Sequence, residues 1–126
     1  MMNETWAEKT ILVVEDDEIS LEFLKELLEP YNVGMLFADN GKKALDVCRE
    51  NPDIALVLMD VQLPVMNGRE SMKEIKKINP DTPVVAQTAF AMSGDKERYL
   101  REGFDAYISK PINVRELIAI IEKFLG

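Results

Sequence analysis

Short apolar runs alternate with longer amphipathic segments along the whole chain. The five runs lie at residues 10–15, 33–37, 54–59, 83–88 and 106–109. Each run has the length of a strand and is apolar on both faces, which is typical of parallel strands that are covered on both sides. The pattern therefore predicts an α/β fold, with one parallel five-stranded sheet and helices on both of its faces.

The segments between the runs carry apolar residues at helical spacing. Clear examples are Ile19, Phe23, Leu24, Leu27 and Leu28 in the first segment, and Leu117, Ile118, Ile121, Phe124 and Leu125 in the last. Asn67 and Asn113 are each followed three residues later by Glu, so both resemble the capping boxes that begin helices. The segment 93–103 has few apolar residues, and we expect it to be the least anchored helix, begun by Ser93.

The length of 126 residues suits one domain, and the net charge of −8 argues against a general nucleic-acid or anionic membrane surface. No apolar stretch approaches the ~20 residues of a membrane span, and no secretory signal is visible. Cys48 is the only cysteine and the chain has no histidine, so a disulfide within the chain and a phospho-histidine are both excluded. We expect a cytoplasmic protein with a mobile arm over 1–8, a single domain over 9–126 and no output domain.

Acidic residues follow two of the predicted strands, and a lysine follows a third. Glu15 and Asp16 come directly after the apolar residues 11–14, Asp60 comes directly after the third run, and Lys110 follows the fifth. The carboxyl ends of parallel strands meet at one edge of a sheet, where ligands bind at the switch in strand order. The sequence therefore predicts a pocket of carboxylates with one cation beside it, which suits a divalent metal and a phosphoryl group.

Four motifs together resemble the receiver domain of two-component response regulators. They are Ile-Leu-Val-Val-Glu15-Asp16-Asp17, Met59-Asp60-Val-Gln-Leu-Pro64-Val-Met-Asn-Gly68, Gln87-Thr88-Ala89 and Tyr107-Ile-Ser-Lys110-Pro111. The resemblance covers roughly residues 9–125, and its details look most like receivers that work with hybrid sensor kinases. It implies a flavodoxin-like (βα)5 three-layer sandwich with strand order 2-1-3-4-5.

The resemblance also implies a chemistry. Asp60 is the expected phosphoacceptor, because a carboxylate can attack phosphorus to form an aspartyl phosphate. Mg²⁺, with Mn²⁺ as a substitute, is expected on Glu15, Asp16, Asp60 and the backbone carbonyl of Gln62. Many receivers have Asp where this chain has Glu15, so Glu15 is expected to bind the metal either directly or through water. Asp17 is interpreted as a helix cap.

A second set of residues is implied to read the phosphoryl group. Lys110 would pair with the phosphoryl oxygens, Thr88 would donate to one of them, and Tyr107 would move into the space that Thr88 leaves. The surface around residues 89–110 would change as a result. Gln62 and Phe90 occupy positions that influence hydrolysis of the phosphoryl group in the family. We hypothesise that Phe90 shields the phosphoryl group from water and slows its hydrolysis. An equally weighted alternative is that Phe90 is only an aromatic residue of a loop, available to a partner protein.

The resemblance also implies partners, and because the chain has no histidine, the phospho-histidine would belong to another protein. A histidine kinase or a histidine phosphotransfer protein would supply the phosphoryl group, and a downstream protein would bind the surface 93–125. Phosphorylation-dependent dimerisation is a further expectation, whereas direct nucleic-acid binding and membrane insertion are not expected. Such a domain assists its own phosphorylation and dephosphorylation, but it is not an enzyme that turns over a metabolite.

Two other classes of protein fit the residues less well. A phosphatase of the haloacid-dehalogenase type usually needs a second Asp two residues after the nucleophile, where this chain has Gln62. A flavodoxin-like binding module needs a loop rich in Ser, Thr or Gly after the first strand, and residues 15–18 are instead all acidic. A receiver that serves only as a docking surface would lack the acids, Thr88 or Lys110.

Overall fold

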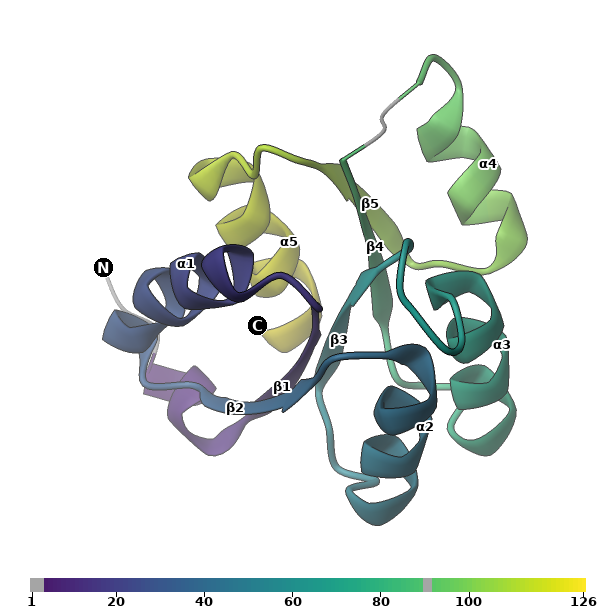
Figure 1. Ribbon diagram of the computed structural model, residues 1–126. Helices are drawn as coiled ribbons and strands as arrows, with labels where there is room; N and C mark the ends of the chain where they lie inside the picture. Colours follow the sequence, from purple (N-terminus) through teal and green to yellow (C-terminus); the bar gives the residue numbers. More distant parts are fainter. Residues whose placement is uncertain (1–3, 90–91) are drawn as a thin grey trace.

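The computed structural model describes residues 4–89 and 92–126, and it confirms the predicted sheet. Five parallel strands lie in the order β2-β1-β3-β4-β5. Their bounds are β1 (Thr10–Val14), β2 (Gly34–Ala38), β3 (Leu56–Asp60), β4 (Val84–Thr88) and β5 (Ala106–Ser109). The helices are α1 (Glu18–Leu28), α2 (Gly41–Glu50), α3 (Gly68–Ile78), α4 (Asp95–Glu102) and α5 (Val114–Leu125), with 3-10 helices η1 (Glu4–Glu8) and η2 (Glu29–Tyr31). Helices α1 and α5 cover one face of the sheet, and α2, α3 and α4 cover the other (Figure 1).

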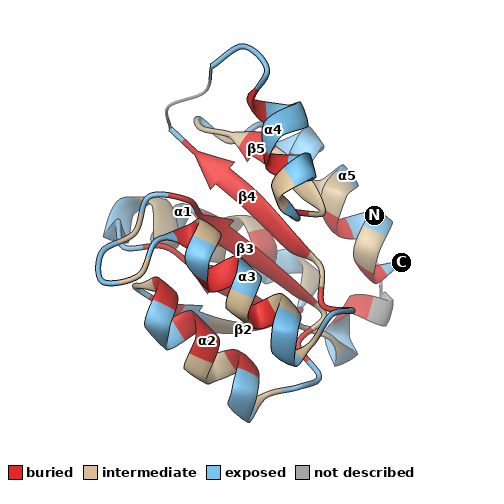
Figure 2. Ribbon diagram, turned by 90° about the vertical axis from the view of Figure 1, so that its right-hand side faces the viewer, coloured by how far each residue is buried: buried red, intermediate tan, exposed pale blue. Residues whose placement is uncertain are grey.

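Alternation along the strands divides the core into two clusters. Ile11 and Val13 of β1 belong to the cluster under α1 and α5, whereas Leu12 and Val14 belong to the cluster on the opposite face. All residues of β3 and β4 are buried, and Figure 2 shows both strands red between their helices. Burial on both faces is the reason that the runs are continuously apolar.

Side chains at the helix starts accept hydrogen bonds from the first turn. Asn67 Oδ1 accepts from Glu70 N, and Asn113 Oδ1 accepts from Glu116 N, both at 3.0 Å. Asp17 caps α1 by accepting from Ser20 N at 3.1 Å. These contacts confirm the three predicted caps, which satisfy backbone N–H groups that have no partner within the helix.

Helix α4 differs from its prediction at its start. It begins after Gly94, which has a φ of 86° and no capping side chain, so Ser93 is not the cap. Its anchors are aromatic and polar: Tyr99 is buried, and Arg69 of α3 donates from Nε to Glu102 at 2.9 Å. Only Asp95 and Tyr99 of this helix are buried, so its weak anchoring relative to the other helices stays a prediction.

The predicted mobile arm over 1–8 is wrong for its described part, because residues 4–8 form η1. Trp6 is fully buried, and its ring lies 4.8 Å from that of Tyr31 between centroids. Trp6 Nε1 donates to the carbonyl oxygen of Gly126 at 3.2 Å. The segment therefore joins the core under α1 and α5 and ties the two ends of the chain together.

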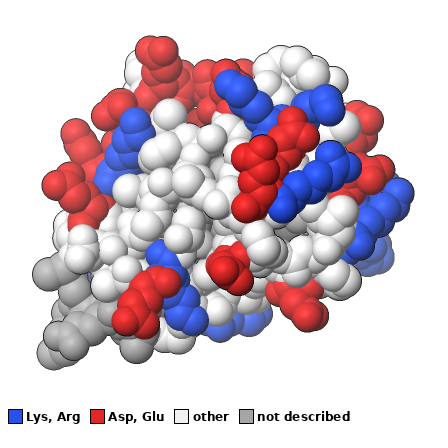
Figure 3. Space-filling model, turned by 90° about the horizontal axis from the view of Figure 1, so that it is seen from below, with Lys and Arg blue, Asp and Glu red and all other residues white. Residues whose placement is uncertain are grey.

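Charges of both signs lie on the surface. In Figure 3, Asp and Glu side chains are interspersed with Lys and Arg side chains, with uncharged surface between them. The absence of a general nucleic-acid surface, expected from the net charge of −8, stays a prediction. No helix in the described part of the chain is long and apolar enough to cross a membrane.

Candidate functional site

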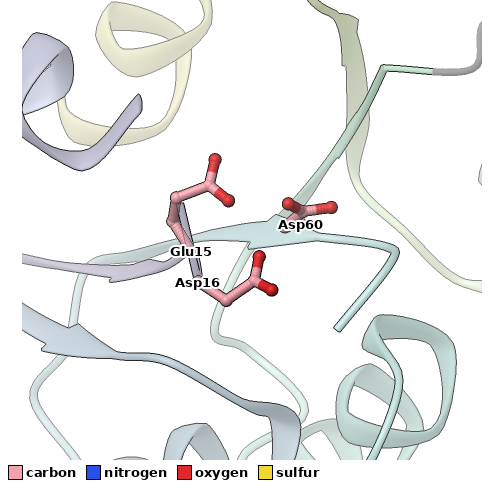
Figure 4. Close-up of side chains that lie close together, drawn as sticks. All are labelled: Glu15, Asp16 and Asp60. Atoms are coloured by element: carbon pink, nitrogen blue, oxygen red, sulfur yellow. The ribbon is translucent and has the colours of Figure 1, made fainter. Parts of the chain in front are cut away.

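Three carboxylates converge at the carboxyl edge of the sheet, as predicted. Glu15 and Asp16 follow β1, Asp60 ends β3, and Figure 4 shows their side chains facing a shared space. One oxygen of each lies within 4.8 Å of those of the other two. Glu15 and Asp60 are buried, whereas Asp16 is exposed. Three oxygens so close together fit a hard divalent cation such as Mg²⁺, which takes a few carboxylates and keeps several waters.

Lys110 supplies the predicted cation. Its Nζ donates a hydrogen bond to Glu15 Oε1 and lies 3.3 Å from Asp60 Oδ2. Its backbone N donates to the carbonyl oxygen of Thr88 at 2.8 Å, which extends the pairing of β5 with β4 by one residue. The backbone is therefore fixed where the long side chain can reach both acids.

Burial, hydrogen bonds and neighbouring charges shift the pKa values of Glu15 and Lys110 at this edge of the sheet. Burial, followed by the hydrogen bond to Asp60, raises the pKa of Glu15 from 4.5 to about 7 despite the nearby Lys110. Burial alone would lower the pKa of Lys110, but its hydrogen bond to Glu15 and the charge of Asp60 outweigh that effect and raise it. Without a metal, Glu15 is therefore protonated below about pH 7 and gives up its proton around neutral pH, while Lys110 stays charged.

We expect metal-free protein to lose stability as the pH rises from about 4.5 to about 7, and Mg²⁺ to abolish this loss. The folded protein keeps the Glu15 proton up to about pH 7, whereas the unfolded chain releases it near 4.5, so folding is favoured at the lower pH. The loss is on the order of 2 kcal/mol. Urea unfolding at several pH values, with EDTA or with Mg²⁺, measures it.

The variant Glu15→Gln is the matched control for this pH dependence. It keeps the size of the side chain and removes the titrating group, so its stability in EDTA is expected to stay level across the same window. A wild-type protein whose stability in EDTA stays constant or rises between these pH values would contradict the raised pKa.

Local backbone geometry orients the Asp60 side chain. Gln62 N donates to Asp60 Oδ1 at 2.9 Å, which leaves the other oxygen toward Lys110. The loop after β3 returns so tightly that a Cβ on Gly68 would lie 2.4 Å from the carbonyl oxygen of Asp60. Only glycine fits this close approach, which explains its place in the third-strand motif.

The two predicted switch residues lie on neighbouring strands. Thr88 ends β4 and is buried, and Tyr107 of β5 is half-buried. The Tyr107 ring stacks on Tyr99 of α4, with 5.4 Å between centroids and 17° between planes. Burial raises the pKa of the Tyr107 hydroxyl. A movement of Tyr107 would therefore disturb α4 directly.

Phe90, the predicted shield of the phosphoryl group, lies outside the described residues. Gln87 was noted in the third motif without a role, yet its side chain is fully buried, and neither amide atom has a hydrogen-bond partner within residues 4–89 and 92–126. A buried polar group without a partner costs about 1–3 kcal/mol. The available signal was a glutamine inside an otherwise apolar strand.

Comparisons with known proteins agree with this site and fold. Residues 11–122 match the family described as the response regulator receiver domain. The polar-differentiation response regulator DivK of Brucella anthropi is 43% identical over 121 residues, which cover 94% of this chain and 97% of that protein.

Solved structures give the same result at lower identity. The receiver domain of the sensor histidine kinase PA1611 from Pseudomonas aeruginosa, with magnesium coordinated in its active-site cleft, is 29% identical at a TM-score of 0.82, covering 94% of this chain and 98% of that one. The receiver domain of Saccharomyces cerevisiae Ssk1, crystallised with the histidine phosphotransfer protein Ypd1, is also 29% identical at 0.82, covering 93% and 88%.

These comparisons confirm the expected family but not the expected subtype. Identity is higher to DivK, which the chain matches over nearly its full length, than to the kinase receiver. A specific likeness to hybrid-kinase receivers is therefore not supported. The four motifs, the strand order and the acidic edge are those of one family, and the chain belongs to the response regulator receiver domains of two-component signalling.

Proposed function

We propose that this protein is a signalling switch that accepts a phosphoryl group on Asp60 from a phospho-histidine of a partner protein. The observation that carries the proposal is the contact of Lys110 with Asp60 inside a cluster of three carboxylates. An aspartate in a helix cap or a solvated turn needs neither a half-buried lysine nor two further acids beside it.

Asp60 is the nucleophile in this proposal. An oxygen of its carboxylate forms a bond to phosphorus, the phosphorus–nitrogen bond of the donor breaks, and the electron pair returns to the imidazole. Mg²⁺ would be held by Glu15, Asp16, Asp60 and the backbone carbonyl of Gln62, and it supplies charge neutralisation at the phosphoryl oxygens. Lys110, whose Nζ lies 3.3 Å from Asp60 Oδ2, supplies a further positive charge.

The output side of the switch is proposed on the surface 93–125. Thr88 turns toward the phosphoryl group, Tyr107 leaves its stack on Tyr99, and α4 and β5 present a changed surface to a downstream protein or to a second copy. Gln62 and Phe90 would set how readily water hydrolyses the aspartyl phosphate. The stacked pair supports this route, because it joins a switch residue to the helix that must respond.

The phosphoryl donor is proposed to dock on an apolar patch beside Lys110. Ile19 is 82% exposed and Phe23 is 42% exposed, which is unusual for large apolar side chains on one helix face. They border a hollow of about 380 Å³ that Lys110 and Pro111 also line. A donor histidine must approach Asp60 from outside, and this patch continues the rim of the site, so an apolar helix of the donor protein fits it.

We expect Phe23→Ala to slow transfer from a phosphorylated histidine phosphotransfer protein by at least about tenfold, since apolar anchors dominate such interfaces. The rate with acetyl phosphate should stay unchanged, because this small donor makes no contact with α1. Quenched time courses of phosphorylation with each donor measure the two transfer rates separately. An equal effect on both donors would contradict the docking proposal and indicate damage to the site.

Intact mass after incubation with acetyl phosphate and Mg²⁺ tests the proposed function itself. One added phosphoryl group is expected, absent when EDTA replaces Mg²⁺ and removed by hydroxylamine, which cleaves acyl phosphates but not phosphate esters. No adduct from acetyl phosphate or from a phosphorylated histidine phosphotransfer protein, in samples shown to bind Mg²⁺, would overturn it.

A further inference from the structure

A buried polar row runs across three neighbouring strands at the edge of the sheet. Asp60 pairs with Gln87 in the β3–β4 register, and Glu15 follows Val14, which pairs with Met59, so Glu15 continues the same level on β1. All three side chains are buried. Two of them are carboxylates with partners, whereas the Gln87 carboxamide has none within the described residues.

The path of the Lys110 side chain passes this carboxamide. Lys110 extends β5, and its Nζ reaches Asp60 on β3, so the side chain crosses the end of β4, which lies between them. Gln87 lies on the crossed face: Val85, two residues earlier, and Ile108, its register partner, both belong to the cluster under α1 and α5. Lys110 follows Ile108 by two residues and so rises from that same face.

Lys110 needs a new acceptor when the site is loaded. Its ammonium has three N–H donors, and in this structure two of them point to Glu15 and Asp60. A divalent cation on Glu15 and a phosphoryl group on Asp60 would remove the first of these contacts and alter the second. A neutral carboxamide oxygen can accept the freed N–H without adding negative charge next to the phosphoryl group, which a third carboxylate would do.

We propose that Gln87 is a positioning residue of the phosphoryl site, whose carboxamide oxygen accepts a hydrogen bond from the Lys110 ammonium when that ammonium leaves Glu15. The inference rests on the proposed function, and it assigns a role to the buried amide that has no partner in this structure. Gln87 thus favours the loaded site, because only there does its oxygen gain a partner.

Nuclear magnetic resonance of the wild-type protein tests the contact directly. The side-chain amide signals of Gln87, identified by their absence from Gln87→Met, are recorded without metal and with Mg²⁺ plus beryllofluoride, a phosphoryl analogue that binds without group transfer. A shift of these signals and of the Lys110 Nζ resonance on loading is expected. Gln87 and Lys110 signals that stay in place while other signals of the site move would overturn the proposal.

Kinetics of Gln87→Met supply a second readout, because methionine keeps the length of the side chain and removes its polar atoms. The metal-free variant is expected to unfold at a higher temperature, yet to be phosphorylated by saturating acetyl phosphate about tenfold more slowly, the effect of one lost hydrogen bond to a charged group. The KM for acetyl phosphate and the affinity for Mg²⁺ should not change. A wild-type rate for this variant would overturn the proposal.

Val85→Ala is the matched control, since it alters the same face of the same strand one pleat away from the site. It should unfold at a lower temperature and keep the wild-type rate of phosphorylation. A slowed rate in this control would assign the effect to core packing and overturn the role of Gln87. If wild-type protein takes no phosphoryl group at all, the proposed function fails, and the beryllofluoride spectra decide the Gln87 contact independently.

Discussion

Asp60→Asn is expected to abolish phosphorylation completely. The amide is a poor nucleophile, and it also removes one of the three carboxylates that would hold Mg²⁺. The fold should survive, because the Asn carbonyl oxygen can still accept the hydrogen bond that Gln62 N donates at 2.9 Å. Intact mass after incubation with acetyl phosphate and Mg²⁺, together with a urea unfolding curve of the same sample, measures both effects.

Asp53→Asn is the matched control for the loss of one carboxylate. Asp53 is exposed and precedes β3, at the end of the strand opposite Asp60. This variant should take up one phosphoryl group at the wild-type rate. A hydroxylamine-labile adduct on a folded Asp60→Asn protein would place the phosphoacceptor elsewhere, and Glu15 and Asp16 would then be the residues to map.

Trp6→Ala is expected to cost about 3–5 kcal/mol of the free energy of unfolding, the usual range for a large aromatic removed from a core. Trp6 is fully buried, packs on Tyr31 and donates to the carbonyl oxygen of Gly126, so the loss includes both packing and a hydrogen bond. Domains of this kind are stable by only about 5–15 kcal/mol in total. Urea unfolding followed by circular dichroism measures the change without relying on tryptophan fluorescence.

Trp6→Phe separates the two contributions. Phenylalanine keeps most of the ring packing against Tyr31 but cannot donate to Gly126. The free energy of unfolding should therefore fall by about 1 kcal/mol for the hydrogen bond, plus a small amount for the packing defect. The alanine variant should still be phosphorylated under conditions where it is folded, because η1 lies away from the acidic edge (Figure 1). An unfolding midpoint equal to that of wild type would show that η1 contributes no stability.

The candidate site was largely predictable from the chain. Glu15, Asp60 and Lys110 each follow an apolar run, and parallel strands bring their carboxyl ends to one edge whatever the details of packing. Their contacts were not predictable. The hydrogen bond from Lys110 to Glu15, which would compete with the proposed metal binding by that acid, joins side chains at the ends of β5 and β1, with β4 and β3 between them.

The sequence by itself determined the elements and the chemistry of their ends. The spacing of apolar positions along the chain distinguishes buried strands from amphipathic helices. Asn67 and Asn113 mark helix starts by accepting hydrogen bonds from residues three positions later. Both signals are therefore local in the sequence. The tertiary structure alone decided the burial of Trp6, the anchoring of α4 by Tyr99 and Arg69, and the unpartnered carboxamide of Gln87. Each of these depends on residues that are distant in the chain and meet only when the sheet and its helices pack, and a local pattern carries no information about such pairs.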